Sequence, residues 1–214
     1  MNLGNLVSLP YVYVRLYPSI IFLVIANLIP LYGVLVLGWD LFTVMILFWL
    51  ETVVVGIYGL LRIIVVTHIL SIFLVPFFVI HFGMFMLGHL LFLTSFFGDE
   101  TVFVSKGFLG LVPFAFALAV AHWPVVGGFI VSHGYSFVYN FLSRKEYVQF
   151  NAGQLMTLPY RRVIIMHITI IFGGMLIIAF SSEVVGVLLL LILKLVTDIW
   201  LHIREHASAQ KRTT

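Results

Sequence analysis

The stretch from Leu41 to Leu61, LFTVMILFWLETVVVGIYGLL, decides the fold, because Glu51 is its one charged residue and lies at its centre. The hydrocarbon core of a bilayer is crossed by a helix of about 20 predominantly apolar residues. The stretch therefore predicts a transmembrane helix that carries a carboxyl group at mid-depth.

The rest of the chain has the same character. Of its 214 residues, 63% are apolar and 9% are charged, and the mean hydropathy is +1.20. Soluble domains are about half apolar and about a quarter charged, so this chain lacks the polar surface that water requires. No cysteine is present, which excludes disulfides, thiolate metal sites and haem attached through cysteine pairs. The pI near 9.3 indicates loops that face the anionic headgroups of the lipid bilayer, and no nucleic-acid partner.

Apolar runs separated by polar or turn residues predict an all-α, polytopic bundle with six transmembrane helices in a single integral membrane domain, residues 1–214. Residues 107–122 are expected to form an interfacial helix, and residues 143–159 a loop at the inner face. Two crossings within residues 107–142 would give the alternative of seven spans. The six spans are expected at about 18–37, 41–61, 70–97, 124–142, 160–180 and 184–203.

The distribution of basic residues favours six spans over seven. Lys and Arg accumulate in cytoplasmic loops. With six spans and both termini in the cytoplasm, Lys106 is the one basic loop residue that faces outward, together with Asp40, Asp99, Glu100 and Glu183. A seventh span would place Arg144 and Arg162 on the opposite side from Arg15 and Arg62. The sequence therefore predicts a multi-pass protein of the cell membrane.

Polar side chains recur at a similar depth in all six predicted helices. An ionisable group at bilayer depth costs roughly 2.5–3.5 kcal/mol on insertion scales, so each such group is a functional hypothesis. Polar residues that are merely tolerated would be scattered over different depths, so a band at one depth indicates a shared internal cavity. Its members are Asn27, Glu51, His81, His133 and Lys194 near the middle, with His167 and Asp198 about one turn closer to the cytoplasm.

The histidines of this band suggest a metal site. His81, His133 and His167 with Asp198 would form a set of ligands suited to zinc or another first-row divalent metal. His202 lies four residues after Asp198 and extends the set along the last helix. The alternative is that each histidine bonds to a neighbouring helix and specifies packing. His89, near the outer interface, is expected to be structural.

Four kinds of function fit this band. The first is metal-assisted hydrolysis of a lipid-like substrate, with Glu51 or Asp198 as the base and Lys194 as an electrostatic stabiliser. The second is electron transfer through haem b held by two histidines. The third is a proton- or cation-coupled transporter that uses Glu51, Lys194 and Asp198. Two carboxylates against one ammonium would leave a buried negative charge, which a bound metal ion or a proton could neutralise. The fourth is a structural membrane subunit. The sequence leaves the oligomeric state open.

The chain resembles a prokaryotic multi-pass membrane family of unknown function. The resemblance covers nearly the whole chain and implies that these polar positions are the signature of a family in the prokaryotic cytoplasmic membrane. It implies no particular activity. The motifs that carry it are His81-x-Gly83-x-Phe85-x3-His89, Ser132-His133-x2-Ser136-Phe137-x2-Asn140, Pro159-Tyr160-x-Arg162-x4-His167 and Lys194-x3-Asp198-x3-His202.

A second similarity is to seven-helix zinc hydrolases of the alkaline ceramidase and adiponectin receptor superfamily. Asp198, His202, His206 and His81 resemble the zinc-binding residues of that superfamily. This similarity implies a zinc ion and a lipid-like substrate.

Overall fold

The computed structural model of the chain describes residues 29–98, 100–180, 188–189, 191–193 and 195–196. All regular elements in these ranges are helices, and no strand occurs among them. The prediction of an all-α protein is therefore confirmed for this part of the chain. Most of the first and last predicted spans, residues 18–37 and 184–203, lie outside the described residues.

The chain forms two compact units, Met1–Trp39 with Gly173–Thr214, and Asp40–Phe172. In the first unit, residues 29–36 are helical. The backbone N–H of Trp39 donates to the carbonyl of Gly33 at 3.0 Å. A Cβ atom at position 33 would collide with the Trp39 ring, so this turn requires glycine.

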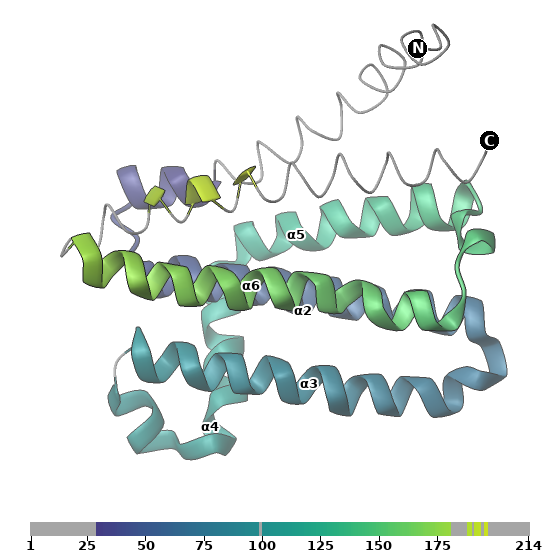
Figure 1. The fold of residues 1–214 in the computed structure, drawn as a ribbon, viewed down its shortest axis with the longest axis horizontal. Coiled ribbons are helices and arrows are strands. Elements are labelled where there is room, and N and C mark those ends of the chain that lie inside the picture. The colour runs from purple at the N-terminus through teal and green to yellow at the C-terminus, as the bar shows by residue number, and fades with distance from the viewer. Residues whose placement is uncertain (1–28, 99, 181–187, 190, 194, 197–214) are drawn as a thin grey trace, which may run out of the picture. The chain divides into compact units, whose positions relative to one another are not determined.

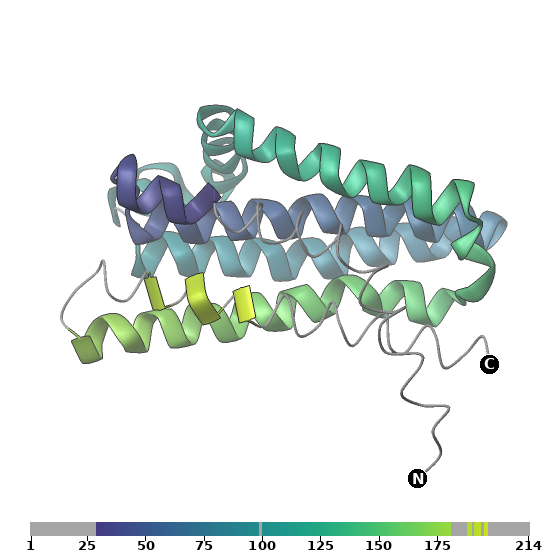
Figure 2. The same ribbon diagram turned by 90° about the horizontal axis from the view of Figure 1, so that it is seen from above.

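The second unit contains five longer helical segments (Figures 1 and 2). A short 3-10 turn joins the first two, and a π-helical segment extends the fourth. The final helix, α6, continues beyond Phe172 into the first unit. In chain order the elements are α2 (Leu41–Thr67), η1 (His68–Leu70), α3 (Ser71–Phe96), α4 (Glu100–Ala121), α5 (Trp123–Tyr135), η2 (Ser136–Ser143), η3 (Glu146–Gln149) and α6 (Ala152–Phe180).

Helix α2 is the central helix of this unit. Its N-cap is Asp40, whose Oδ1 accepts a hydrogen bond from the Thr43 N–H at 2.8 Å. Every residue from Val44 to Leu50 is buried. Seven consecutive residues cover all sides of a helix, so this part of α2 is surrounded by other elements. The helix ends at His68, whose φ of 45° turns the chain back into α3.

Helices α2 and α3 form an antiparallel hairpin (Figure 1). The indole N–H of Trp49 donates to the carbonyl of Met86 at 2.7 Å. Seven residues further along α2, a Cβ at Gly56 would collide with the Phe82 ring, which lies earlier on α3. The opposite order of these two contacts fixes the antiparallel direction.

Helices α5 and α6 lie on opposite sides of the α2–α3 hairpin (Figure 2). The Tyr58 hydroxyl of α2 donates to the Ile130 carbonyl of α5 at 2.9 Å. Further along both helices, the Arg62 guanidinium lies over the Phe141 ring at 5.3 Å, so α5 with η2 runs parallel to α2. On the other side, a Cβ at Gly59 would lie 2.7 Å from Cγ of Pro159 in α6.

Helix α4 is broken and bent. Gly107 has a φ of 60° and a ψ of −170°, which lie outside the helical region. The segment Gly110–Ala121 then meets Trp123–Ser143 at 90°, with His122 at the break. Helix α4 therefore begins at Glu100, earlier than the interfacial helix expected over residues 107–122.

The predicted loop of residues 143–159 is shorter than expected, because α6 begins at Ala152. Asn151 and Gln154 form a reciprocal capping pair. The Gln154 N–H donates to Oδ1 of Asn151 at 2.9 Å, and the Asn151 N–H donates to Oε1 of Gln154 at 3.1 Å. Arg162 consequently lies about 15 Å along α6, at 1.5 Å per residue, rather than at the start of a helix.

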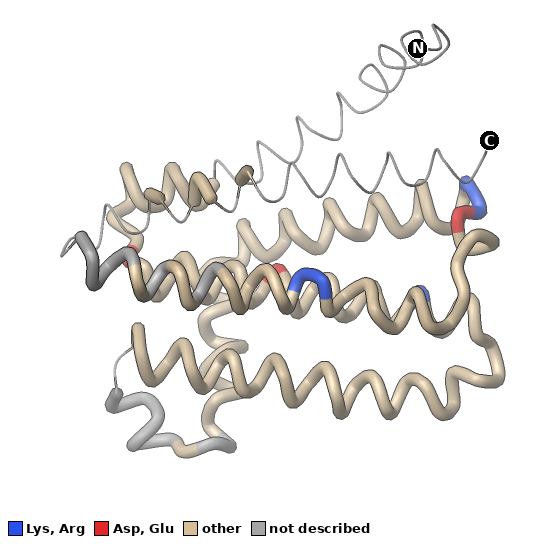
Figure 3. The backbone as a smooth tube through the Cα atoms, in the orientation of Figure 1, with Lys and Arg blue, Asp and Glu red and all other residues tan. Residues whose placement is uncertain are grey.

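The helices expose large apolar side chains. On α3, Phe73, Phe77, Ile80 and Met84 form an exposed stripe at helical spacing. Long helical stretches carry no charged residue (Figure 3). Judged by length and composition, the described residues contain one helical segment that could cross a membrane, the 56-residue Leu41–Phe96, in which an 18-residue window has a mean hydropathy of 2.7. The bent pair Gly110–Ala121 and Trp123–Ser143 would add a second.

Candidate functional site

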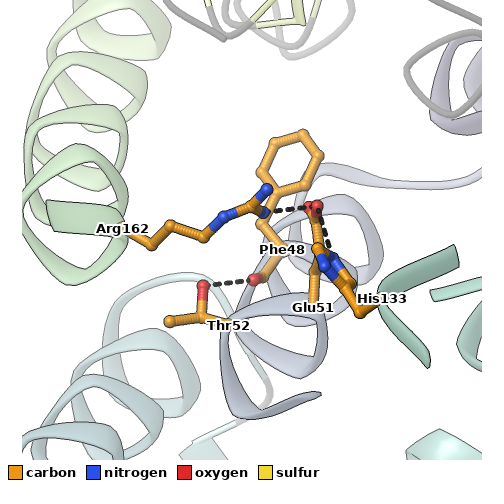
Figure 4. A network of polar contacts seen from close by, with 5 residues as sticks. All are labelled: Phe48, Glu51, Thr52, His133 and Arg162. Carbon is orange, nitrogen blue, oxygen red and sulfur yellow. Dashed lines mark hydrogen bonds and ion pairs between the residues drawn. The ribbon is translucent and has the colours of Figure 1, made fainter. Parts of the chain in front are cut away.

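Three helices bring polar side chains together at Glu51. Oε1 of Glu51, on α2, accepts a hydrogen bond from Nη1 of Arg162, on α6, at 2.5 Å. Nε2 of His133, on α5, lies 3.9 Å from the same oxygen. The Glu51 side chain is 13% exposed. Figure 4 shows the three side chains converging on the carboxylate. We call Glu51, His133 and Arg162 the carboxylate cluster.

Two buried residues of α2 lie next to Glu51 in the carboxylate cluster. Phe48 and Thr52 flank Glu51 on α2 and are each 4% exposed. The Thr52 hydroxyl donates to the Phe48 carbonyl at 2.9 Å, so it is satisfied within its own helix (Figure 4). An ion pair in such surroundings is screened less than one at a surface, and its two charges depend strongly on each other.

His133 lies between Glu51 and an aromatic group. The rings of His133 and Tyr58 are 6.4 Å apart, and those of Tyr58 and Phe137 are 5.9 Å apart. A separation of 3.9 Å from Glu51 is too long for a hydrogen bond but within ion-pair distance. A small movement of either side chain would therefore allow a proton to pass between the imidazole and the carboxylate.

A second set of polar contacts joins α3 to α6. Nδ1 of His81 and the Tyr160 hydroxyl are hydrogen-bonded at 2.5 Å. The edges or faces of Phe78, Phe82 and Phe85 surround the Tyr160 ring at centroid distances of 6.3, 5.8 and 6.2 Å. Aromatic rings therefore pack around Tyr160, whereas its partner His81 is exposed.

About two turns further along the same two helices, two histidines meet. Nε2 of His89 lies 3.0 Å from Nδ1 of His167. Nδ1 of His89 lies 2.7 Å from the Phe85 carbonyl oxygen, and the two imidazole planes are at 89°. The His81–Tyr160 and His89–His167 contacts progress in the same direction on both helices, so α3 and α6 are parallel.

Comparison with known proteins assigns the chain to a family. The model of a family of unknown function, DUF6498, matches residues 15–214. The chain belongs to this family. Among curated proteins and among solved structures, no match to the chain is found. The predicted family of unknown function is therefore confirmed, and its activity has to be inferred from the site.

In this DUF6498 member, the predicted site residues lie in separate contacts. Glu51 and His133 come together, His81 pairs with Tyr160, and His167 pairs with His89. Lys194, Asp198 and His202 lie outside the described residues. Within the described ranges, no group of three or more His, Cys, Asp or Glu side chains is placed to hold a metal ion. The five-residue metal set stays a prediction.

Arg162, Tyr160 and His89 take part in these contacts, although the sequence did not single them out as catalytic or metal-binding residues. Arg162 was expected in the inner loop region, but the early start of α6 places it well inside a helix. The Asn151-x2-Gln154 capping pattern was the signal that could have located it. For His89, the eight-residue spacing from His81 places both imidazoles near one face of α3, toward the same partner helix.

A cavity of about 660 Å³ lies at the end of α2, away from the carboxylate cluster. Val65, Val66 and His68 of α2 and η1 form one wall, and residues of η2, η3 and Phe150 form the other. None of its lining residues belongs to the carboxylate cluster. The cavity therefore offers room for a ligand or water at this end of the bundle without reaching Glu51 directly.

Proposed function

We propose that this DUF6498 member is a multi-pass membrane protein with six spans. A straight helix over Leu41–Phe96 would be about 84 Å long, nearly three times the roughly 30 Å hydrocarbon core. The antiparallel packing of α2 and α3 supports two crossings by this segment. The 90° bend at His122 supports a surface helix followed by one crossing through α5 and η2.

The charges at the two ends of the bundle support a cytoplasmic location for both termini. Arg62 lies near the end of α2, and Arg144 and Lys145 follow η2, which runs parallel to α2. Asp40 caps the opposite end of α2. Basic residues favour the cytoplasmic side, so the end with η2 and η3 would face the cytoplasm of a prokaryotic cell (Figure 3).

The function that the geometry supports best is proton-coupled transport, and the Glu51–Arg162 bond beside His133 carries this proposal. Arg162 keeps its charge at any working pH, whereas Glu51 and His133 can each gain or lose a proton. Protonation of Glu51 removes the negative charge that holds Arg162. The link between α2 and α6 would then weaken, so proton uptake would be coupled to movement of one helix against another.

Proton movement in liposomes tests this proposal. The full-length protein is reconstituted with a pH-sensitive dye inside, and carboxylates, phosphate or monovalent cations are added outside as separate classes. One class should drive a change of internal pH, and Glu51→Gln should slow it at least ~10-fold, because a general acid–base group typically contributes 10²–10⁴-fold. Glu146→Gln, in the surface element η3, is the matched control and should behave as wild type.

Two results would overturn the proposal of proton-coupled transport. One is the absence of proton movement with every solute class in protein shown to be folded. The other is an unchanged rate in Glu51→Gln. Glu51→Asp keeps the carboxylate but withdraws it from Arg162, so a rate between those of wild type and Glu51→Gln would support a role for the carboxylate itself.

A metal-dependent hydrolase of lipid-like substrates is the second proposal. Its support is the pairing of Glu51 with His133, because a carboxylate next to an imidazole can serve as base beside a metal ligand. The ligands would be His81, His133, His167, Asp198 and His202, with Lys194 as stabiliser. Zinc or iron at one ion per chain that is lost in His133→Ala would support this site, and unchanged metal content in that variant would contradict it.

A further inference from the structure

We propose that His89 and His167 form a binding site for one divalent first-row transition metal ion, which links α3 to α6. The inference does not depend on the carboxylate cluster. It starts from two imidazole nitrogens on different helices, Nε2 of His89 and Nδ1 of His167, that face each other at 3.0 Å.

The backbone fixes the tautomer of His89. The Phe85 carbonyl oxygen, 2.7 Å from Nδ1 of His89, can only accept a hydrogen bond. Nδ1 of His89 therefore carries the hydrogen, and Nε2 presents a lone pair toward α6. A histidine that binds a metal usually donates its other ring N–H to a carbonyl or carboxylate in this way, which orients the ring.

His167 can supply the second ligand without a change of charge. With His89 in the fixed tautomer, the neutral His167 ring donates its Nδ1–H to Nε2 of His89. Transfer of that proton through solvent to Nε2 of His167 leaves a lone pair on Nδ1. Two lone pairs then face one point, both rings remain neutral, and no oxidant or reductant is required.

The distance between the two nitrogens suits a small ion. A metal ion bonded to both nitrogens at about 2.0–2.1 Å would have an N–metal–N angle of roughly 95° at their present separation. If the nitrogens moved apart by a few tenths of an ångström, the angle would become tetrahedral. Haem iron between the same atoms would need them on opposite sides, roughly 4 Å apart. Imidazole ligands suit zinc, copper and nickel, and disfavour magnesium and calcium.

A second contact holds the two helices in register. His81 and Tyr160 are hydrogen-bonded eight residues before His89 and seven before His167, about 12 Å and 10 Å along the respective helix axes. The two imidazoles are therefore already positioned before an ion arrives, which lowers the entropy lost on binding. Water or other oxygen donors would complete the coordination of the ion.

Metal titration of the full-length protein tests this inference. Detergent-purified protein is stripped with a chelator and titrated with Zn²⁺, followed by metal analysis after desalting. One ion per chain is expected. His89→Gln and His167→Gln should each weaken binding by more than ~100-fold, because each removes a ligand. Loss of a group that only orients a ligand already costs about 10–100-fold. Zn²⁺ should also raise the unfolding midpoint of wild type but not of these two variants.

His122→Gln is the control, because Nδ1 of His122 lies 3.0 Å from the Leu118 carbonyl oxygen and His122 belongs to neither proposed site. It should bind Zn²⁺ as wild type does, and so should Glu51→Gln. Retention of full affinity in both His89→Gln and His167→Gln would overturn the site. So would equal loss in His81→Gln or His133→Ala, which would instead indicate a wider ligand set. Normal Zn²⁺ binding by Glu51→Gln separates this site from the proposed proton site.

Discussion

Helix α6 makes two kinds of polar contact with the α2–α3 hairpin. Its contact with α2 contains the charged pair Glu51–Arg162 and the close approach of Gly59 to Pro159; we call it the charged seam. Its contact with α3 contains the His81–Tyr160 and His89–His167 pairs; we call it the neutral seam. The same helix is therefore held by one strong, interdependent contact and by two contacts that are each satisfied pairwise.

The two seams should differ in how strongly the loss of one side chain destabilises the protein. Removing one partner of a buried ion pair leaves an uncompensated charge and typically costs 3–5 kcal/mol. Removing one partner of a neutral hydrogen bond typically costs about 0.5–1.5 kcal/mol. Loss of one group should thus be far more damaging in the charged seam than in the neutral seam.

The largest effect is expected for Arg162→Met. The substitution removes the guanidinium and leaves the Glu51 carboxylate, 13% exposed, without its 2.5 Å ion-pair contact. The free energy of unfolding should fall by about 3 kcal/mol, at the lower end of the range because the Arg162 side chain is 32% exposed. Unfolding of the full-length protein in detergent, followed by helical circular dichroism, measures this change.

A double-mutant cycle shows whether the loss belongs to the pair. Glu51→Gln together with Arg162→Met removes both charges, so the double variant should be more stable than Arg162→Met alone. Simple addition of the two single losses would contradict an ion-pair origin and indicate that Arg162 stabilises the fold by packing.

An intermediate effect is expected for Gly59→Ala in the charged seam. The new Cβ would lie 2.7 Å from Cγ of Pro159, part of a rigid ring, so α2 and α6 would have to separate. Overpacking of this kind typically costs about 1–3 kcal/mol. Gly83→Ala on α3 is the control, because its Cβ would meet no atom within 4 Å, and it should raise stability by about 0.5–1 kcal/mol. Equal losses in the two variants would show that helix separation is not the cause.

The sequence was sufficient to predict the helical class and most helix positions in the described part. Long apolar runs identify α2 and α3, and the expected limits of residues 41–61 and 70–97 fall close to Leu41–Thr67 and Ser71–Phe96. The start of α6 was misplaced, because the apolar run begins near Tyr160 whereas the Asn151–Gln154 capping pair initiates the helix earlier. Hydropathy follows burial in lipid, whereas a capping pair acts through local hydrogen bonds.

Partner choice in the site was harder to predict than the residues themselves. The sequence predicts Glu51 and His133 at a similar depth, and Nε2 of His133 lies 3.9 Å from Oε1 of Glu51. The bond of Glu51 to Arg162 was not expected, because the charge pattern assigned Arg162 to the cytoplasmic loops. A long arginine side chain can reach several ångströms along a helix, so its residue number gives little indication of where its charge lies.

The smallest effect is expected for Tyr160→Phe in the neutral seam. The substitution removes the hydroxyl bonded to His81 but keeps the ring that packs against Phe78, Phe82 and Phe85. One neutral hydrogen bond contributes about 0.5–1.5 kcal/mol, so the free energy of unfolding should fall by about 1 kcal/mol. Tyr160→Leu, which also removes the ring, should cost more. A loss in Tyr160→Phe as large as that in Arg162→Met would remove the distinction between the two seams, since a single neutral hydrogen bond would then be as important as the ion pair.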